Sequence, residues 1–132
     1  MNKNIKILGI DYGRSKVGLA ISEGGLAEPL KVIRYQEQEK LRQEIKEIVE
    51  REKIEIIVVG VSEGEMAEET REFRKRLEKE LNIPVEEFDE TLTTYEAKEL
   101  SRQAGINRKK RHEMEDAYAA AIMLQNYIDN RP

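Results

Sequence analysis

Cysteine is absent from this sequence of 132 residues, and histidine occurs only once. Without cysteine, neither a disulfide framework nor a zinc site with thiolate ligands can form. A single histidine also excludes a metal site built from several imidazoles. Any metal ion bound by this chain must therefore be held by oxygen ligands, which are the ligands that magnesium and manganese prefer.

Long hydrophobic segments are also missing. No apolar run approaches the length that crosses a bilayer, and the N-terminus lacks the apolar core of a signal peptide. We therefore expect a cytoplasmic protein without a membrane partner. The net charge of -4 argues against a protein that coats polyanions with its whole surface, so a nucleic-acid partner would require a local basic patch.

The length of the chain predicts one domain, over residues 1–132, and its first apolar segment organises the rest. Residues 5–11 place apolar side chains on both faces of a strand, which is typical of a central strand. Asp11 then lies at the rim of the sheet, and Gly13 lets a ligand approach the backbone. We interpret Asp11 as a candidate for chemistry; the alternative is an aspartate that only satisfies amides of a turn.

Hydrophobic spacing predicts the other elements. They are a second strand that ends at residue 21, further strands over 30–35, 54–59 and 84–90, and helices over 36–52, 65–81, 93–104 and 113–129. Three antiparallel strands followed by β-α-β connections, which build parallel neighbours, predict a mixed five-stranded sheet flanked by α-helices. This order is compatible with an α/β, ribonuclease H-like fold.

Carboxylates occur near the ends of three predicted elements: Asp11, the adjacent pair Asp89 and Glu90, and Asp116 at the start of the last helix. Such a set can bind divalent cations, which stabilise the attacking and leaving oxygens when a phosphodiester is cleaved. Alternation along a strand lets only one of Asp89 and Glu90 face Asp11, and it does not say which. Glu113 shares a helix face with Asp116 and could assist as a ligand or base. The alternatives are a helix-dipole partner for Asp116 and a solvated acid for Glu113.

A basic segment precedes the last predicted helix. Residues 101–112 contain five lysine or arginine residues and no acid, which supplies the local basic patch required above. The candidates for contacts with a phosphate backbone are Arg108, Lys109, Lys110, Arg111, Arg14 and Lys16. The alternative for the run from 108 to 111 is a solvated loop.

Four blocks, in this order, resemble the YqgF (RuvX-type) family: GIDYG at 9–13 with GLA at 18–20, DETLTT at 89–94, RKKR at 108–111 and DAYAAAIMLQ at 116–125. That family is ribonuclease H-like, is distantly similar to the RuvC Holliday-junction resolvases and is linked to maturation of the 5′ end of 16S ribosomal RNA. Carried over by position, the resemblance implies that Asp11, Glu90 and Asp116 are the catalytic acids and hold Mg²⁺ or Mn²⁺. It therefore favours Glu90 over Asp89.

Two segments depart from the family pattern. Residues 61–65 are short and acidic where the family has a Leu-Pro segment and a longer glycine-rich loop, and Thr91 stands where the family has arginine. The loss of a cation and the added acids predict weaker binding to a polyanion.

The leading hypothesis is a metal-dependent nuclease for structured nucleic acid, with precursor 16S ribosomal RNA favoured over four-way DNA. One alternative is a Holliday-junction resolvase on branched DNA, and another is a non-catalytic nucleic-acid or ribosome-associated binding module. A relative of the actin-like ATPases ranks last, because those enzymes close a cleft between two such domains. RNA trimming is compatible with a monomer or a homodimer, whereas a junction resolvase needs a dimer.

Overall fold

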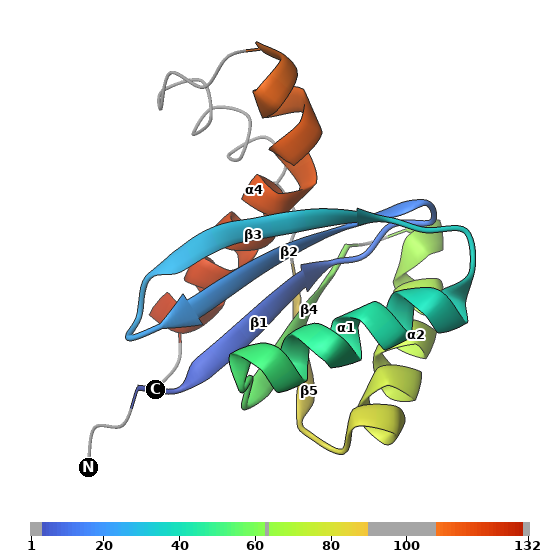
Figure 1. Ribbon diagram of the computed structural model, residues 1–132, viewed down its shortest axis with the longest axis horizontal. Helices are drawn as coiled ribbons and strands as arrows, with labels where there is room; N and C mark the ends of the chain where they lie inside the picture. The colour runs from blue at the N-terminus through green and yellow to red at the C-terminus, as the bar shows by residue number, and fades with distance from the viewer. Residues whose placement is uncertain (1–3, 63, 90–107, 131–132) are drawn as a thin grey trace.

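The computed structural model describes residues 4–62, 64–89 and 108–130, with side chains of the last segment described from residue 113 onward. Five strands and three helices lie in this described part (Figure 1). They are β1 (Lys6–Asp11), β2 (Lys16–Glu23), β3 (Ala27–Arg34), α1 (Gln38–Glu52), β4 (Ile56–Val61), α2 (Glu65–Leu81), β5 (Val85–Asp89) and α4 (Arg108–Asp129).

The strands form one mixed sheet in the order β3-β2-β1-β4-β5. β1 pairs antiparallel with β2, and β2 pairs antiparallel with β3, whereas β1, β4 and β5 run parallel to one another. This confirms the prediction of three antiparallel strands followed by two parallel ones. β1 lies in the centre of the sheet, as its two apolar faces predict, and Leu8 and Ile10 are fully buried.

Helices cover both faces of the sheet (Figure 1). On one face, Leu8 and Ile10 of β1 belong to the same apolar cluster as Leu41 of α1 and Phe73 of α2. On the other face, Ile7 of β1 packs in a second cluster whose helical members all come from α4. Because side chains alternate along a strand, even-numbered residues of β1 face α1 and α2, and odd-numbered residues face α4.

The predicted core faces of α1 and α2 are confirmed. Leu41, Ile45, Ile48 and Val49 of α1 are buried, at the spacing that predicted them. α2 begins and ends where its pattern predicts, at Glu65 and Leu81. Asn82 follows it in the left-handed conformation with φ of 58°, a helix ending that asparagine accepts more readily than most residues.

Several boundaries differ from the prediction by two residues or more, and three of them have a physical reason. β3 begins at Ala27 rather than at 30, because its pairing with β2 continues to Ser22. β4 runs to Val61 rather than 59, because it stays paired first with β1 and then with Asp89 of β5. α4 begins at Arg108 rather than at 113, since lysine and arginine are good helix formers and no glycine or proline follows Gly105 within the segment. The predicted helix over 93–104 lies outside the described residues.

Candidate active site

Asp11 ends the central strand on the face that α4 covers. Its sheet partners are Gly18 on β2 and Gly60 on β4. Two residues earlier, a Cβ atom built on Gly9 would lie 3.0 Å from the Cβ atom of Leu124 in α4. Asp11 continues that alternation, so it belongs to the same face at the point where the strand ends.

The backbone of α4 touches the sheet beside Asp11. A Cβ atom on Gly18 would lie 1.9 Å from the carbonyl oxygen of Asp116 and 2.8 Å from the amide nitrogen of Ala117. No side chain fits between them, so glycine at this position is what lets the helix approach so closely. Paired Cα atoms in antiparallel strands are about 4.5–5.5 Å apart, so Asp11 lies one strand away from the point where Asp116 meets the sheet.

Small side chains of α4 allow this approach. Ala117, Ala120 and Ala121 are all buried against the sheet. Asp116 lies in the third turn of the helix because the helix begins at Arg108. The alternative reading of Asp116 as a helix-dipole partner in the first turn is therefore wrong, since that effect is confined to the first turn.

Lys16 joins Asp116 from the neighbouring strand. Its Nζ atom lies 3.2 Å from Oδ2 of Asp116, and the two side chains are 35% and 29% exposed. Lys16 precedes Gly18 by two residues on β2, so both residues belong to the face of α4. Three charged residues, Asp11, Lys16 and Asp116, thus gather around Gly18 at one end of this face.

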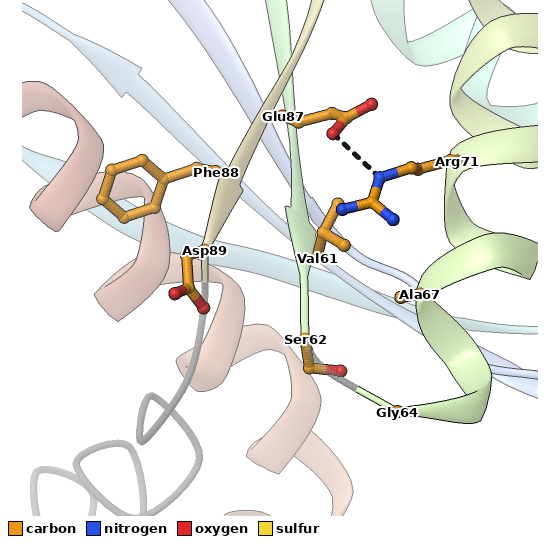
Figure 2. A pocket seen from close by; sticks show the side chains of 8 residues that line it. All are labelled: Val61, Ser62, Gly64, Ala67, Arg71, Glu87, Phe88 and Asp89. Carbon is orange, nitrogen blue, oxygen red and sulfur yellow. Dashed lines mark hydrogen bonds and ion pairs between the residues drawn. The ribbon is translucent and has the colours of Figure 1, made fainter.

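The end of β5 separates Asp89 from this face. Glu86 accepts a hydrogen bond from the hydroxyl of Tyr127 in α4 at 2.7 Å, and Phe88 packs edge-to-face on the same ring with centroids 5.9 Å apart. Asp89 follows on the opposite face, where it borders a surface cavity of about 520 Å³ with Arg71 and other residues from β4, α2 and β5 (Figure 2). Asp89 is therefore not the member of the Asp89–Glu90 pair that shares the face of Asp11. Glu90 lies outside the described residues.

A sequence profile of the RuvX family, described as Holliday junction resolvase, matches residues 5–130. The chain belongs to the RuvX family. A relative from Halothermothrix orenii, named "Putative pre-16S rRNA nuclease", is 38% identical over 133 residues, with 95% of each chain covered. A relative of the same name from Clostridium botulinum is 36% identical and is covered over 97% of its length. These matches confirm the family resemblance seen in the four sequence blocks.

Solved structures confirm the ribonuclease H-like fold of this RuvX-family chain. Thermus thermophilus RuvC, in complex with a Holliday junction substrate, superposes with a TM-score of 0.64 at 17% identity and covers 95% of each chain. The Holliday junction resolvase of fowlpox virus superposes with a TM-score of 0.66 at 10% identity, over 96% of this chain and all of that one. At such low identities the likeness concerns the fold alone.

The donor set of the RuvX-family chain suits a hard divalent cation. Asp11 and Asp116 bring carboxylate oxygens to one end of one sheet face, and such oxygens are the preferred ligands of Mg²⁺ and Mn²⁺. Within the described residues, no group of three or more acidic, histidine or cysteine side chains is close enough to hold a metal ion. Glu113 is exposed and lies one turn of α4 before Asp116.

The predicted phosphate-binding side chains fall in different places. Arg14 pairs with Glu69 of α2, with an Nη2–Oε2 distance of 3.0 Å, whereas Lys16 pairs with Asp116 on the other side of the sheet. The run from 108 to 111 forms the first turn of α4, so the alternative reading of these residues as a loop is wrong for the backbone. In Figure 1, the first turns of α4 extend beyond the sheet. The side chains of this run are outside the described part.

A polar network that supports the β1–β2 turn has no signal in the sequence. The hydroxyl of Tyr35 donates to the carbonyl oxygen of Gly13 at 2.5 Å, and the side-chain amide of Gln38 donates to the hydroxyl of Tyr12 at 2.5 Å. Tyr12 also stacks on Phe73 of α2, with ring centroids 4.4 Å apart. Burial is the main cause that raises the pKa of Tyr35 above its ordinary value, which keeps its hydroxyl a proton donor. These contacts fix the turn between Asp11 and Lys16 from the face opposite α4.

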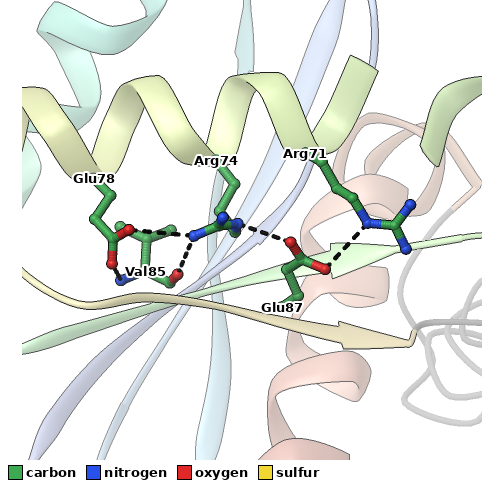
Figure 3. A network of polar contacts seen from close by, with 5 residues as sticks. All are labelled: Arg71, Arg74, Glu78, Val85 and Glu87. Carbon is green, nitrogen blue, oxygen red and sulfur yellow. Dashed lines mark hydrogen bonds and ion pairs between the residues drawn. The ribbon is translucent and has the colours of Figure 1, made fainter. Parts of the chain in front are cut away.

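An ion-pair network ties the edge strand β5 to α2 (Figure 3). Arg74 donates to Glu87 at 2.9 Å and to the carbonyl oxygen of Val85 at 2.9 Å, and it lies 3.3 Å from Glu78. Arg71 donates to the other oxygen of Glu87 at 3.2 Å. The side chain of Arg74 is only 16% exposed, so this pair is better shielded than an ordinary surface ion pair. The network holds the strand that leads to Asp89.

Proposed function

We propose that this chain is a metal-dependent nuclease that acts on structured nucleic acid, and that it processes the 5′ end of precursor 16S ribosomal RNA in the cytoplasm. The close contact of α4 with Gly18 carries this proposal, because it brings Asp116 beside Asp11. Membership of the RuvX family and the names of the relatives support a nuclease and favour an RNA substrate.

Asp11, Glu90 and Asp116 would hold Mg²⁺ or Mn²⁺ in this proposal, with Glu113 as an outer partner. The bound cation supplies charge stabilisation for the attacking and leaving oxygens of the phosphodiester. Asp11 contributes from a strand fixed by hydrogen bonds on both sides, and Asp116 contributes from a helix packed directly on Gly18. Rigid mounting of this kind keeps reacting groups within the narrow range of productive geometry.

The first turn of α4 would hold the phosphate backbone. Arg108, Lys109, Lys110 and Arg111 precede Asp116 on one helix, and at 1.5 Å per residue they begin about 12 Å from it along the axis. A nucleic-acid strand positioned at Asp116 would therefore pass this basic turn. Lysine and arginine at that distance neutralise phosphates beside the scissile bond and fix the register of the strand.

The test is cleavage of a precursor 16S fragment and of a four-way DNA junction, each in Mg²⁺, in Mn²⁺ and in EDTA. We expect Asp11→Asn, Glu90→Gln and Asp116→Asn each to abolish cleavage while the circular dichroism spectrum stays that of the wild type. Glu115→Gln serves as a matched control, because it changes a carboxylate next to Asp116 in the same turn. Wild-type cleavage by the three variants would remove the proposal.

The likeness to RuvC with its junction substrate favours one alternative, a dimeric Holliday-junction resolvase. Cleavage of the junction but not of the RNA, by a protein that sediments as a dimer, would select it. Binding of either substrate without cleavage in all divalent ions would instead select a non-catalytic binding module.

A further inference from the structure

The ion pair between Lys16 and Asp116 stands where the proposed metal site needs a carboxylate. The Nζ–Oδ2 distance is 3.2 Å, and about a third of each side chain is exposed. The backbones of both residues are fixed, one in β2 and the other at the contact of α4 with Gly18. The carboxylate of Asp116 is therefore already attached to a cation that the chain itself supplies.

The ammonium group of Lys16 can be replaced by another cation. An ion pair with this much exposure is weak, because water screens the charges and the lysine side chain loses rotational freedom when it is held. A divalent cation carries twice the charge of an ammonium group and favours several carboxylate oxygens at once. Lys16 and a divalent cation therefore compete for the carboxylate of Asp116, and the divalent cation binds more strongly wherever a second carboxylate is also a ligand.

The neighbouring basic residue of the same turn does not take part in this competition. Arg14 is bound to Glu69 of α2, with its Nε and Nη2 atoms each 3.0 Å from Oε2, on the side of the sheet away from α4. Lys16, in contrast, faces Asp116 and lies two residues from Gly18, which pairs with Asp11. The two cations differ in partner and in face, although only two residues separate them in the sequence.

We propose that Lys16 is a positioning residue that occupies the carboxylate of Asp116 until a divalent cation replaces it, and that its freed ammonium group then binds a phosphate of the nucleic acid. The proposal rests on the proposed function, since it takes Asp116 as a metal ligand. Metal binding and nucleic-acid binding are thereby coupled, because the exchange that binds the metal ion also frees the ammonium group of Lys16 for the phosphate backbone. Lysine suits this role as a compact point charge on a flexible stem.

Binding of Mn²⁺ alone, measured by isothermal titration calorimetry, tests the first step. Lys16→Met removes the competing charge at similar length, and we expect it to tighten Mn²⁺ binding by about three- to tenfold, from the loss of one nearby positive charge in a partly exposed site. Lys16→Arg keeps the charge and should stay within about twofold of the wild type. Arg14→Met, the matched control, removes the same charge from the same turn and should also leave Mn²⁺ affinity within about twofold.

Binding of a precursor 16S fragment tests the second step, with fluorescence anisotropy read in EDTA and in Ca²⁺ and the RNA checked for integrity afterwards. In EDTA, Lys16 is held by Asp116 and makes no phosphate contact, so Lys16→Met should weaken RNA binding only slightly, through the loss of one neutralising charge, and leave the salt slope unchanged. In Ca²⁺, the freed ammonium contributes one phosphate contact, so the same substitution should weaken binding several-fold and lower the salt slope by about one. A purely structural role would weaken binding equally in both conditions.

The outcomes separate this proposal from the proposed function. If Asp116→Asn lowers Mn²⁺ affinity but Lys16→Met binds Mn²⁺ as the wild type does or more weakly, the competition is overturned and the nuclease proposal stands. Equal losses of RNA affinity in EDTA and Ca²⁺ overturn the release of Lys16 to phosphate. If Asp116→Asn binds Mn²⁺ as tightly as the wild type, Asp116 is not a ligand and both proposals fail.

Discussion

At Gly18, both the packing of α4 and the proposed chemistry depend on the absence of a Cβ atom. In Gly18→Ala, the new Cβ atom would lie 1.9 Å from the carbonyl oxygen of Asp116 and 2.2 Å from its carbonyl carbon. Both are backbone atoms of a helix, so no side-chain rotation relieves the clash. The helix must retreat by roughly 1 Å or more at this point, because packed interiors leave no room for such an overlap.

Two measurable losses follow from that retreat. Overpacking of this kind costs about 1–3 kcal/mol of unfolding free energy, part of which is offset by the reduced entropy of alanine in the unfolded chain. Displacement of a reacting group by about 1 Å costs about a hundredfold in rate. We therefore expect a fall in urea-unfolding stability of about 1–2 kcal/mol, together with a fall of about a hundredfold in the rate of Mg²⁺-dependent cleavage.

Gly9→Ala provides the matched control. Its Cβ atom would lie 3.0 Å from the Cβ atom of Leu124, on the same face and against the same helix but two turns beyond Asp116. We expect a smaller destabilisation, because a contact of 3.0 Å with a side chain is relieved by a shift of a few tenths of an ångström, and most of the cleavage rate should be retained because the contact at Gly18 is untouched. Gly18→Ala with wild-type stability and wild-type cleavage would refute the claim that this close contact positions Asp116. Equal losses of cleavage rate in Gly18→Ala and Gly9→Ala would refute the claim that the contact at Gly18 has a specific role at the site.

Three further predictions concern groups around the site. Tyr35→Phe removes the donor to Gly13 and should lower the free energy of unfolding in urea by about 1 kcal/mol. The pKa of Tyr35 is raised in the folded state, so the wild type should lose stability as pH rises above about 10, where the tyrosine of the unfolded chain ionises. The variant lacks this hydroxyl and should lose less stability over the same pH range. Arg74→Met leaves Glu78 and Glu87 without their shared partner. We expect it to lower the free energy of unfolding by about 1–2 kcal/mol and to speed amide hydrogen exchange in β5. Lys75→Met, on the exposed side of α2, is the control and should do neither. Reversal of charge across Arg108–Arg111 should weaken RNA binding and flatten its dependence on salt, and an unchanged slope would contradict the role given to this turn.

The sheet could be predicted from the sequence because its signals are local. The two apolar faces of β1 specify a central strand, and the spacing of Thr70, Phe73 and Leu77 specifies the buried face of α2. The boundaries of β3 and β4 could not be predicted in the same way, because pairing with neighbouring strands, rather than the hydrophobic pattern, determines where they end. At the ends of strands, contacts with neighbouring strands therefore outweigh the local sequence preference.

The candidate site was predicted less completely, for a physical reason. That Asp11 ends a buried strand is visible in the sequence, but that Gly18 receives the backbone of α4 is visible only once the helix is placed on the sheet. The face of β5 likewise depends on the ring of Tyr127, which lies far along the chain and decides that Asp89 is turned away from Asp11. The partner of Lys16 is a third case, since nothing in the sequence pairs it with Asp116 rather than with another acid.

The charge of the site explains why metal and nucleic acid should bind together. The chain as a whole carries a net charge of -4, and Asp11 and Asp116 add local negative charge at the place where a phosphate would have to sit. A polyanion is repelled by such a surface unless cations neutralise it. Lys16 pairs with Asp116, and a divalent cation bound there would add further positive charge at the end of the sheet and make it more attractive to phosphate. Nucleic-acid affinity should therefore rise with divalent-ion concentration even where no bond is cut, and affinity equal in EDTA and Ca²⁺ would show that binding occurs away from these acids.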